Sequence, residues 1–377
     1  MATPTGVVWA RDPHTAAKHD LLRHYFAAWL PILFQTHPHL TYAEGFAGPG
    51  VYKDDEPGSP VIALEVIASH RDLVALHAHR VVDVVFVEEH SGRRDRLVHE
   101  LGRAHDRLGV PPANVRVHPP VRGDCAEELP KLLTELDGWG APMFVVLDSF
   151  GGPDIPFVLL RSIAQNPSGE VLATFGPTFL TRHGENPQHA ESGDLAFGDT
   201  DWQGVFDQPS ERKWAYLVDA YRTSLHKAGF AYVLSFEMVD ERGNQLWLMF
   251  GTNSKKGLAK MKDAMWAVDP AYGVRYRDPR DPNQMALDIE QDPDTAPLSR
   301  MLLDLLADGP RTLDELREYA LVETVYRPQQ VRPVVQRLLS ERRTTRRDGG
   351  QLAGRSLLTL ADGRAQPISE QPTLFDV

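Results

Sequence analysis

The stretch Leu40-Thr41-Tyr42-Ala43-Glu44-Gly45-Phe46-Ala47-Gly48-Pro49-Gly50 decides the fold, because an apolar run ends on a carboxylate and then on closely spaced glycines. In an α/β sheet, nucleotides bind in the crevice at the carboxyl end of such a strand, where small residues let the backbone approach the ligand. The stretch therefore predicts a strand followed by a turn that can hold a cofactor. The alternative is a glycine-rich turn that binds nothing.

The composition indicates a globular chain with one large and one small domain. Its 377 residues are 42% hydrophobic and 24% charged, which is enough to bury a sizeable core. No apolar run approaches the roughly 18 residues of a membrane span. The N-terminus lacks a secretory pattern, so we expect a cytoplasmic protein without membrane contact. Because Cys125 is the only cysteine, we expect neither a disulfide nor a thiolate zinc site, and no metal.

The order of the remaining elements predicts an α/β fold with a doubly wound, Rossmann-type sheet. Apolar residues at helical spacing indicate a helix over residues 14–35. A second helix opens at Gly58-Ser59-Pro60, with Ser59 as its cap and Pro60 at its first position. Further strands are expected at residues 81–87, 115–118, 143–147 and 171–175, helices at 126–136 and 213–227, and a terminal hairpin at 232–236 and 245–250.

The spacing Glu44-x-Phe46-x-Gly48-x-Gly50 resembles the first motif of S-adenosylmethionine-dependent methyltransferases. It is less similar to the G-x-G-x-x-G motif of nicotinamide and flavin enzymes. The resemblance implies S-adenosyl-L-methionine as the cofactor and places these four residues in the cofactor cleft.

Carboxylates follow the next two strands, at the positions where a methyltransferase needs them. Glu88, or the adjacent Glu89, ends the second strand and can accept hydrogen bonds from both ribose hydroxyls. Asp124 follows the third strand and can accept from the exocyclic amine of adenine, while Glu44 can meet the methionyl amino group. Alternatively, each acid caps a helix beside its strand.

The fourth strand ends in Leu147-Asp148-Ser149-Phe150-Gly151, where amino-methylating enzymes carry an acid or amide, prolines and an aromatic residue. We predict that Asp148 accepts from a target amine and aims its lone pair at the transferred methyl group, and that Phe150 stacks on a base. Ser149 stands in place of the expected proline, which leaves the target atom open. The alternative is a glycine turn in which Asp148 caps the next helix.

Residues 14–275 resemble the three-Cys-motif partner proteins, TcmP, a family similar to class I methyltransferases. The family shows Asp-Pro-Phe-Gly where this chain has Asp148-Ser149-Phe150-Gly151. The resemblance implies a partner with a three-cysteine motif, namely an iron–sulfur protein. It is carried by Lys18 and Trp29, by the motif at residues 44–50, by Gly58-Ser59-Pro60, and by residues 144–151 and 248–266.

The C-terminal part predicts a small winged helix-turn-helix domain. Residues 276–297 have little apolar periodicity and are interpreted as a linker. Three helices are expected at residues 298–307, 313–321 and 328–342, the second capped by Thr312, before an arginine-rich hairpin at 344–360. Between Tyr326 and Leu360 there are eight arginines against one Glu and one Asp, a local charge of 8 − 2 = +6.

This local charge predicts a nucleic-acid-binding surface on a chain whose net charge is −12. Because winged helices also mediate protein contacts, a protein-binding role is the alternative. The predicted nucleic-acid-binding residues are Arg332, Arg337, Arg342, Arg343, Arg346 and Arg347.

The end of the chain carries a second binding signal. Gln371-Pro372-Thr373-Leu374-Phe375 resembles the Gln-x-x-Leu-Phe peptide with which bacterial replication and repair proteins bind the sliding clamp. Two apolar side chains, Leu374 and Phe375, would enter a preformed pocket while Gln371 forms hydrogen bonds. The alternative is a tail that folds back on the body of the protein.

Together these features predict four parts: a methyltransferase-like domain (1–275), a linker (276–297), a winged helix (298–362) and a flexible tail (363–377). The predicted function is S-adenosylmethionine-dependent methylation of an extrahelical or single-stranded base, in DNA modification or repair with an iron–sulfur partner. The alternative is a non-catalytic, DNA-associated adaptor that recruits this partner and the sliding clamp.

Overall fold

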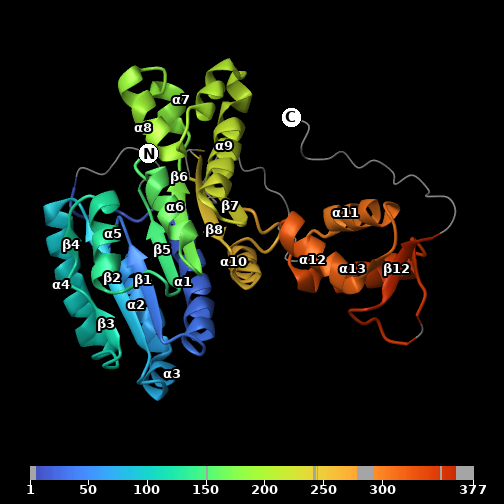
Figure 1. The fold of residues 1–377 in the computed structure, drawn as a ribbon, viewed down its shortest axis with the longest axis horizontal. Helices are drawn as coiled ribbons and strands as arrows, with labels where there is room; N and C mark the ends of the chain where they lie inside the picture. The colour runs from blue at the N-terminus through green and yellow to red at the C-terminus, as the bar shows by residue number, and fades with distance from the viewer. Residues whose placement is uncertain are drawn as a thin grey trace. The chain divides into compact units, whose positions relative to one another are not determined.

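The computed structural model describes residues 6–149, 152–240, 243, 245–277, 293–348 and 350–361. The chain divides into two compact units, residues 1–292 and 293–377. The first unit is an α/β domain and the second is a small helical domain with its own sheet (Figure 1). None of the described helices combines the length and the apolar character that crossing a bilayer requires.

A mixed sheet forms the centre of the first unit, in the order β3-β2-β1-β5-β6-β8-β7-β9, with β4 beside β2. The five strands from β3 to β6 along this order are parallel, whereas β8 is antiparallel to both β6 and β7. The strand bounds are β1 His39–Glu44, β2 Val81–Glu88, β3 Val115–Val117, β4 Val121–Arg122, β5 Met143–Leu147, β6 Gly169–Phe175, β7 Tyr232–Val239, β8 Gln245–Thr252 and β9 Arg275–Arg277.

Helices cover both faces of this sheet, which is why β5 and β6 are buried along their whole length and β5 is entirely apolar (Figure 1). The first layer packs its core against α1 Pro13–Phe34, α2 Ser59–Ser69, α3 Arg71–Leu76, α4 Ser91–Leu108 and α10 Lys255–Val268. The second layer contains α5 Cys125–Glu135, α6 Phe157–Gln165, α7 Thr178–His183, α8 Pro187–Phe197 and α9 Lys213–Ala228. The predicted doubly wound α/β class is confirmed.

One local prediction is wrong, because Ser59 does not cap α2. The cap position belongs to Gly58, and the Ser59 hydroxyl donates instead to Glu44 Oε2 at 2.6 Å. The Ser59 hydroxyl therefore forms a hydrogen bond with a buried carboxyl group and not with the backbone at the start of the helix.

The second unit has the winged-helix order of elements. Its sheet runs β10-β12-β11, and both pairings are antiparallel. Thr312 caps its second helix as predicted, in a reciprocal capping box with Glu315. The elements are α11 Ala296–Ala307, β10 Arg311–Thr312, α12 Leu313–Glu323, α13 Pro328–Ser340, β11 Thr344–Arg346 and β12 Leu357–Leu360.

Close packing fixes the exit of β1. A methyl group built on Gly45 would lie 2.1 Å from Cys125 Sγ and 2.7 Å from Leu147 Cδ2. Gly45 therefore lets α5 and β5 close in on the chain where it leaves the sheet.

We expect Gly45→Ala to lower the free energy of unfolding by about 1–3 kcal/mol, because the added methyl group overpacks this contact. Gly102→Ala is the matched control: Gly102 lies inside α4, where a methyl group meets none of the described atoms within 4 Å. That change should add about 0.5–1 kcal/mol through helix propensity. Denaturant unfolding measures both, and equal stability of Gly45→Ala and wild type would contradict the packing argument.

Candidate functional site

The glycine turn after β1 borders open space at the carboxyl ends of β1 and β5. Gly48 and Gly50 have φ angles of +64° and +74°, in the region that residues with side chains rarely adopt. A methyl group on Gly48 would meet none of the described atoms within 4 Å. At Gly50 it would lie 2.8 Å from Leu97 Cδ1 of α4. Gly48 thus faces the open space, and Gly50 packs the turn against the domain.

A cavity of about 120 Å³ lies over this turn. Gly48, Lys18 of α1 and Asp148 after β5 all line it, together with the aromatic rings of Trp9 and Tyr52. Pockets for small molecules usually begin at roughly 300 Å³. A cavity of roughly 150 Å³ holds a single benzene ring. In this conformation the cavity is therefore smaller than either of these volumes.

An ion pair crosses this cavity between Lys18 and Asp148. Lys18 Nζ donates to Asp148 Oδ2, and the two side chains are 14% and 22% exposed. The pair joins α1 to the end of β5. Asp148 does not cap the next helix, because α6 begins at Phe157 behind Pro156. That alternative is therefore wrong.

Glu44 lies behind the cavity wall. Its side chain is 1% exposed, and its two oxygens accept from Tyr42 Oη at 2.7 Å and Ser59 Oγ at 2.6 Å. Burial raises the pKa of Glu44 to about 8, against the lowering effect of the Ser59 and Tyr42 hydrogen bonds. The carboxyl group is thus mainly protonated at neutral pH. Its contact with a methionyl amino group stays a prediction.

Glu88 is tied to the backbone of the turn. Its two oxygens accept from the N–H groups of Gly48 and His90, both at 2.9 Å, and the residue is 6% exposed. The carboxylate thereby fixes the turn after β1 to the end of β2. Ribose binding by Glu88, or by Glu89 beside it, stays a prediction.

Asp124 caps α5, because Oδ1 accepts from Ala126 N at 2.8 Å and Glu127 N at 3.3 Å. Burial, followed by the charges of Glu89 and Asp124, raises the pKa of Asp154. These three acids therefore lie near one another beside the strand ends. Adenine binding by Asp124 stays a prediction.

The segment before α1 covers the glycine turn. The Trp9 ring lies edge-on to Tyr52 with 5.9 Å between centroids, and the Arg93 guanidinium lies 5.1 Å over it. Lys53 N donates to Trp9 O at 2.8 Å. Arg11 forms an ion pair with Glu56 at 3.6 Å. Residues 6–12 are thus held across the turn from both sides.

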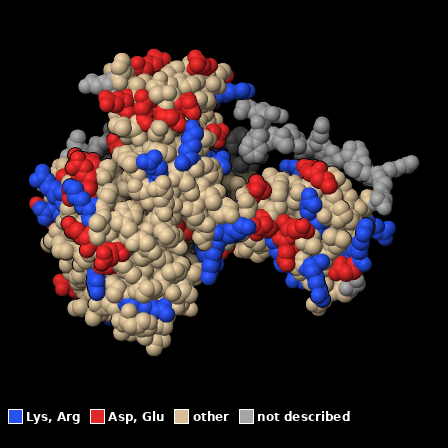
Figure 2. All heavy atoms as spheres, in the orientation of Figure 1, with Lys and Arg blue, Asp and Glu red and all other residues tan. Residues whose placement is uncertain are grey.

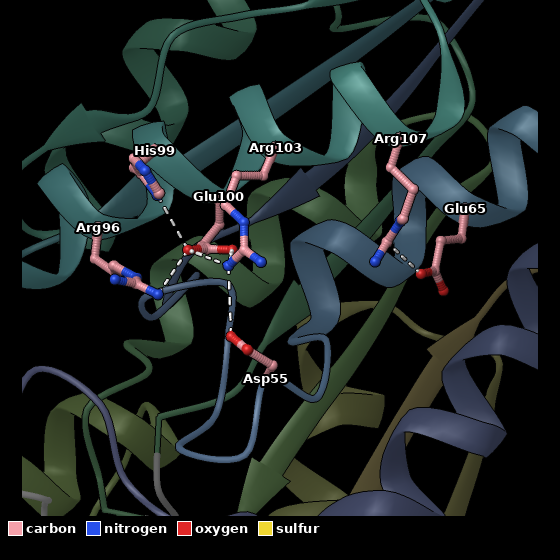
Figure 3. A network of polar contacts seen from close by, with 7 residues as sticks. All are labelled: Asp55, Glu65, Arg96, His99, Glu100, Arg103 and Arg107. Atoms are coloured by element: carbon pink, nitrogen blue, oxygen red, sulfur yellow. Dashed lines mark hydrogen bonds and ion pairs between the residues drawn. The ribbon is translucent and has the colours of Figure 1, made fainter.

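A polar network on α4 holds the loop that follows the turn (Figure 3). Glu100, 5% exposed, accepts from Arg96 at 2.8 Å and from Arg103 at 3.1 Å. Arg103 also reaches Asp55 in the loop at 3.4 Å. Arg107 of the same helix binds Glu65 of α2 at 2.7 Å. The helix after β2 therefore fixes the loop between the glycine turn and α2.

The cavity is lined by four of the residues predicted for the site, namely Phe46, Gly48, Gly50 and Asp148. Phe150 lies outside the described residues. Sequence reasoning missed Trp9, His14 and Tyr52, which also line the cavity. No periodicity or motif marks these three positions, because only the packing of the N-terminal segment brings them to the strand ends.

The predicted arginines of the winged helix differ in their surroundings. Arg332 donates to Leu352 O at 2.7 Å, Arg337 to Ser299 Oγ at 2.7 Å, and Arg346 to Gly350 O. Arg342 and Arg347 are exposed. Figure 2 shows Lys and Arg side chains on the outer surface of this unit, interspersed with acids. Three of the arginines thus brace the wing or α11. The two exposed arginines lie after the end of α13 and on the wing.

Two further predictions concern metal binding and the clamp-binding peptide. In the described part of the chain, no group of three or more His, Cys, Asp or Glu side chains is arranged to hold a metal ion. The predicted clamp-binding residues lie outside the described residues. They are Gln371, Leu374 and Phe375.

The strand order, with antiparallel β8 inserted between β6 and β7, is that of a class I methyltransferase-like domain. The second unit is a winged helix-turn-helix domain, and residues 275–344 match the family model described as GMT-like wHTH domain. No curated protein matches the chain.

Two solved structures are similar at low scores. One is described as the crystal structure of EvdMO1, with a TM-score of 0.29 and 12% identity, over 63% of this chain and 42% of the other. The chain therefore spans less than half the length of that structure. The other is precorrin-6y C5,15-methyltransferase from Geobacter metallireducens GS-15, with a TM-score of 0.27 and 11% identity, over 60% of this chain and 87% of the other.

We expect the stability of the wild type to fall as the pH rises from about 4.5 to about 8, where Glu44 is protonated in the folded chain and ionised in the unfolded chain. The predicted loss is of order 4 kcal/mol. The Glu44→Gln variant has no titratable group at this position, so its stability should not show this loss between about pH 4.5 and 8. Urea unfolding across the window measures the difference between the two proteins, and parallel pH profiles would show that Glu44 is not a buried acid.

Proposed function

We propose that this chain is an S-adenosylmethionine-dependent methyltransferase that acts on DNA. The observation that carries the proposal is one cavity bordered by the open glycine turn after β1 and by Asp148 after β5. In an open α/β sheet, this edge is where ligands bind.

The residues present fit the reactive end of the cofactor. Gly48 leaves the backbone open to a ligand, Phe46 adds an aromatic wall, and Asp148 adds a carboxylate that favours a sulfonium charge. The volume of the cavity does not yet match the whole cofactor, because the cavity is too small for the adenosyl part. The adenosyl part requires residues 6–12 to shift, because these residues cover the turn.

When bound, the cofactor supplies an electrophilic methyl group. The chain's own task is positioning, since a displacement requires the acceptor atom to lie in line with the bond that breaks. Asp148 supports this task by accepting hydrogen bonds from an amino group and thereby fixing the direction of its lone pair. Asp148 directly follows β5, so the end of this strand positions the carboxylate.

The winged helix supplies affinity for DNA in this proposal. It carries most of its local positive charge on α13 and the wing, the elements with which such domains meet the major groove and the backbone. The target base has to leave the stack, because a methyl donor cannot reach it inside a duplex.

The finer parts of the proposal rest on sequence resemblance. These are an iron–sulfur partner with a three-cysteine motif, a role in DNA repair, and binding of the sliding clamp by residues 371–375. A cytoplasmic location is proposed from the sequence composition alone. A non-catalytic adaptor with the same partners is the alternative, and it would follow if the cavity binds no cofactor.

Calorimetric titration with S-adenosylmethionine should show binding to the wild type and an affinity reduced roughly tenfold or more in Gly48→Ala, whose methyl group enters the cavity. Gly140→Ala is the matched control: Gly140 has a φ of +88° and equally open surroundings, in the turn before β5. It should lose stability like Gly48→Ala and keep its affinity. Absence of binding to the wild type at high micromolar cofactor would remove the cofactor assignment.

For DNA binding, we expect Arg347→Ala to weaken affinity for duplex DNA and to reduce the slope of log affinity against log salt by about one. Arg300→Ala, which removes an exposed arginine from α11 in the same domain, should leave the slope unchanged. Fluorescence anisotropy at several salt concentrations measures both variants. Identical slopes for the wild type and Arg347→Ala would exclude a phosphate contact of Arg347.

A further inference from the structure

One carboxylate oxygen of Asp148, Oδ2, already accepts from an amine of the chain. Lys18 Nζ donates to Asp148 Oδ2 inside the cavity. An ammonium group offers the same N–H donors as an amino group that is to be methylated. Lys18 therefore competes with an incoming amine that binds to the same oxygen of this carboxylate.

A second acceptor for Lys18 lies one helical turn away. His14 is 4% exposed, lines the same cavity, and its Nδ1 is buried without a hydrogen-bond partner among the described residues. Residues four apart on a helix are neighbours, and helical side chains lean toward the N-terminus. The Lys18 side chain therefore lies over the turn that carries His14.

Burial keeps the His14 ring neutral near pH 7. Burial, followed by the charge of Lys18, lowers the pKa of His14, while Asp12, Asp240 and Asp148 act in the opposite direction with less effect. A neutral imidazole has one nitrogen that can accept a hydrogen bond. Lys18 thus has two acceptors in the cavity, a carboxylate and an imidazole.

We propose that Lys18 is a positioning residue that occupies the amine position on Asp148 in the ligand-free cavity and moves to His14 when an incoming amino group takes that position. This inference rests on the proposed function. It makes the site selective for ligands that bring an amine to Asp148, because only such a ligand restores the hydrogen bonds that the carboxylate loses when Lys18 leaves.

Two analogues of the cofactor test this exchange by binding alone. Sinefungin carries an amine in place of the sulfonium methyl group, whereas S-adenosylhomocysteine has no group there. In Lys18→Met the competitor is gone, so affinity for sinefungin should rise roughly fivefold while affinity for S-adenosylhomocysteine stays within about twofold. Lys18→Arg retains the charge and should resemble the wild type.

Two further variants separate this role from a structural one. In an Asp148→Asn background, Lys18→Met should leave the ratio of the two affinities unchanged, because the carboxylate for which both amines compete is absent. His14→Leu removes the second acceptor and should weaken sinefungin relative to S-adenosylhomocysteine. Thermal unfolding establishes that each variant is folded.

The outcomes distinguish the inference from the function on which it rests. If both analogues bind the wild type and Lys18→Arg, and Lys18→Met leaves their affinity ratio unchanged, the exchange is refuted and the cofactor site stands. If neither analogue binds the wild type, the cofactor site is refuted and the inference with it.

Discussion

The rest of this domain depends on glycines, which have no side chain, at the close contacts where the chain leaves β1. Gly45 allows Cys125 and Leu147 to pack against the backbone, and Gly58 allows the backbone of Gly50 to approach so closely that a methyl group would lie 2.9 Å from its carbonyl carbon. Because of these contacts, the turn is held at the strand ends from several sides. Gly48 is different, since it faces open space. A rigid turn with one open position is what a ligand at the backbone requires.

Two carboxyl groups at the strand ends beside this turn, Glu44 and Asp148, have different surroundings. Glu44 is enclosed by uncharged donors, Tyr42 and Ser59, and burial raises its pKa to about 8. Asp148 instead meets the ammonium group of Lys18 at the cavity surface. One acid therefore serves as a mainly neutral part of the framework, whereas the other offers charge to the cavity. Their residue types are similar, and only their neighbours separate the two roles.

The arginines of the winged helix also differ in their surroundings, because some make structural contacts and others are exposed. Arg332 and Arg337 use their guanidinium groups to bind the wing loop and α11. Long arginine side chains can brace a small domain and still contribute positive potential at its surface. The local charge of +6 in the sequence therefore includes arginines that also make structural contacts within the domain.

The sequence by itself determined the fold class, the strands at β1, β2, β5 and β6, the capping of α12 by Thr312, and the glycine turn. These features follow from local patterns: apolar runs, helical spacing, and residues whose backbone preferences act over a few positions. Only the tertiary structure decided that Ser59 binds Glu44 in place of the helix end, and that Lys18 reaches Asp148 from 130 positions away. It also brought Trp9, His14 and Tyr52 to the cavity. Such contacts depend on how distant elements pack, and no short pattern in the chain encodes them.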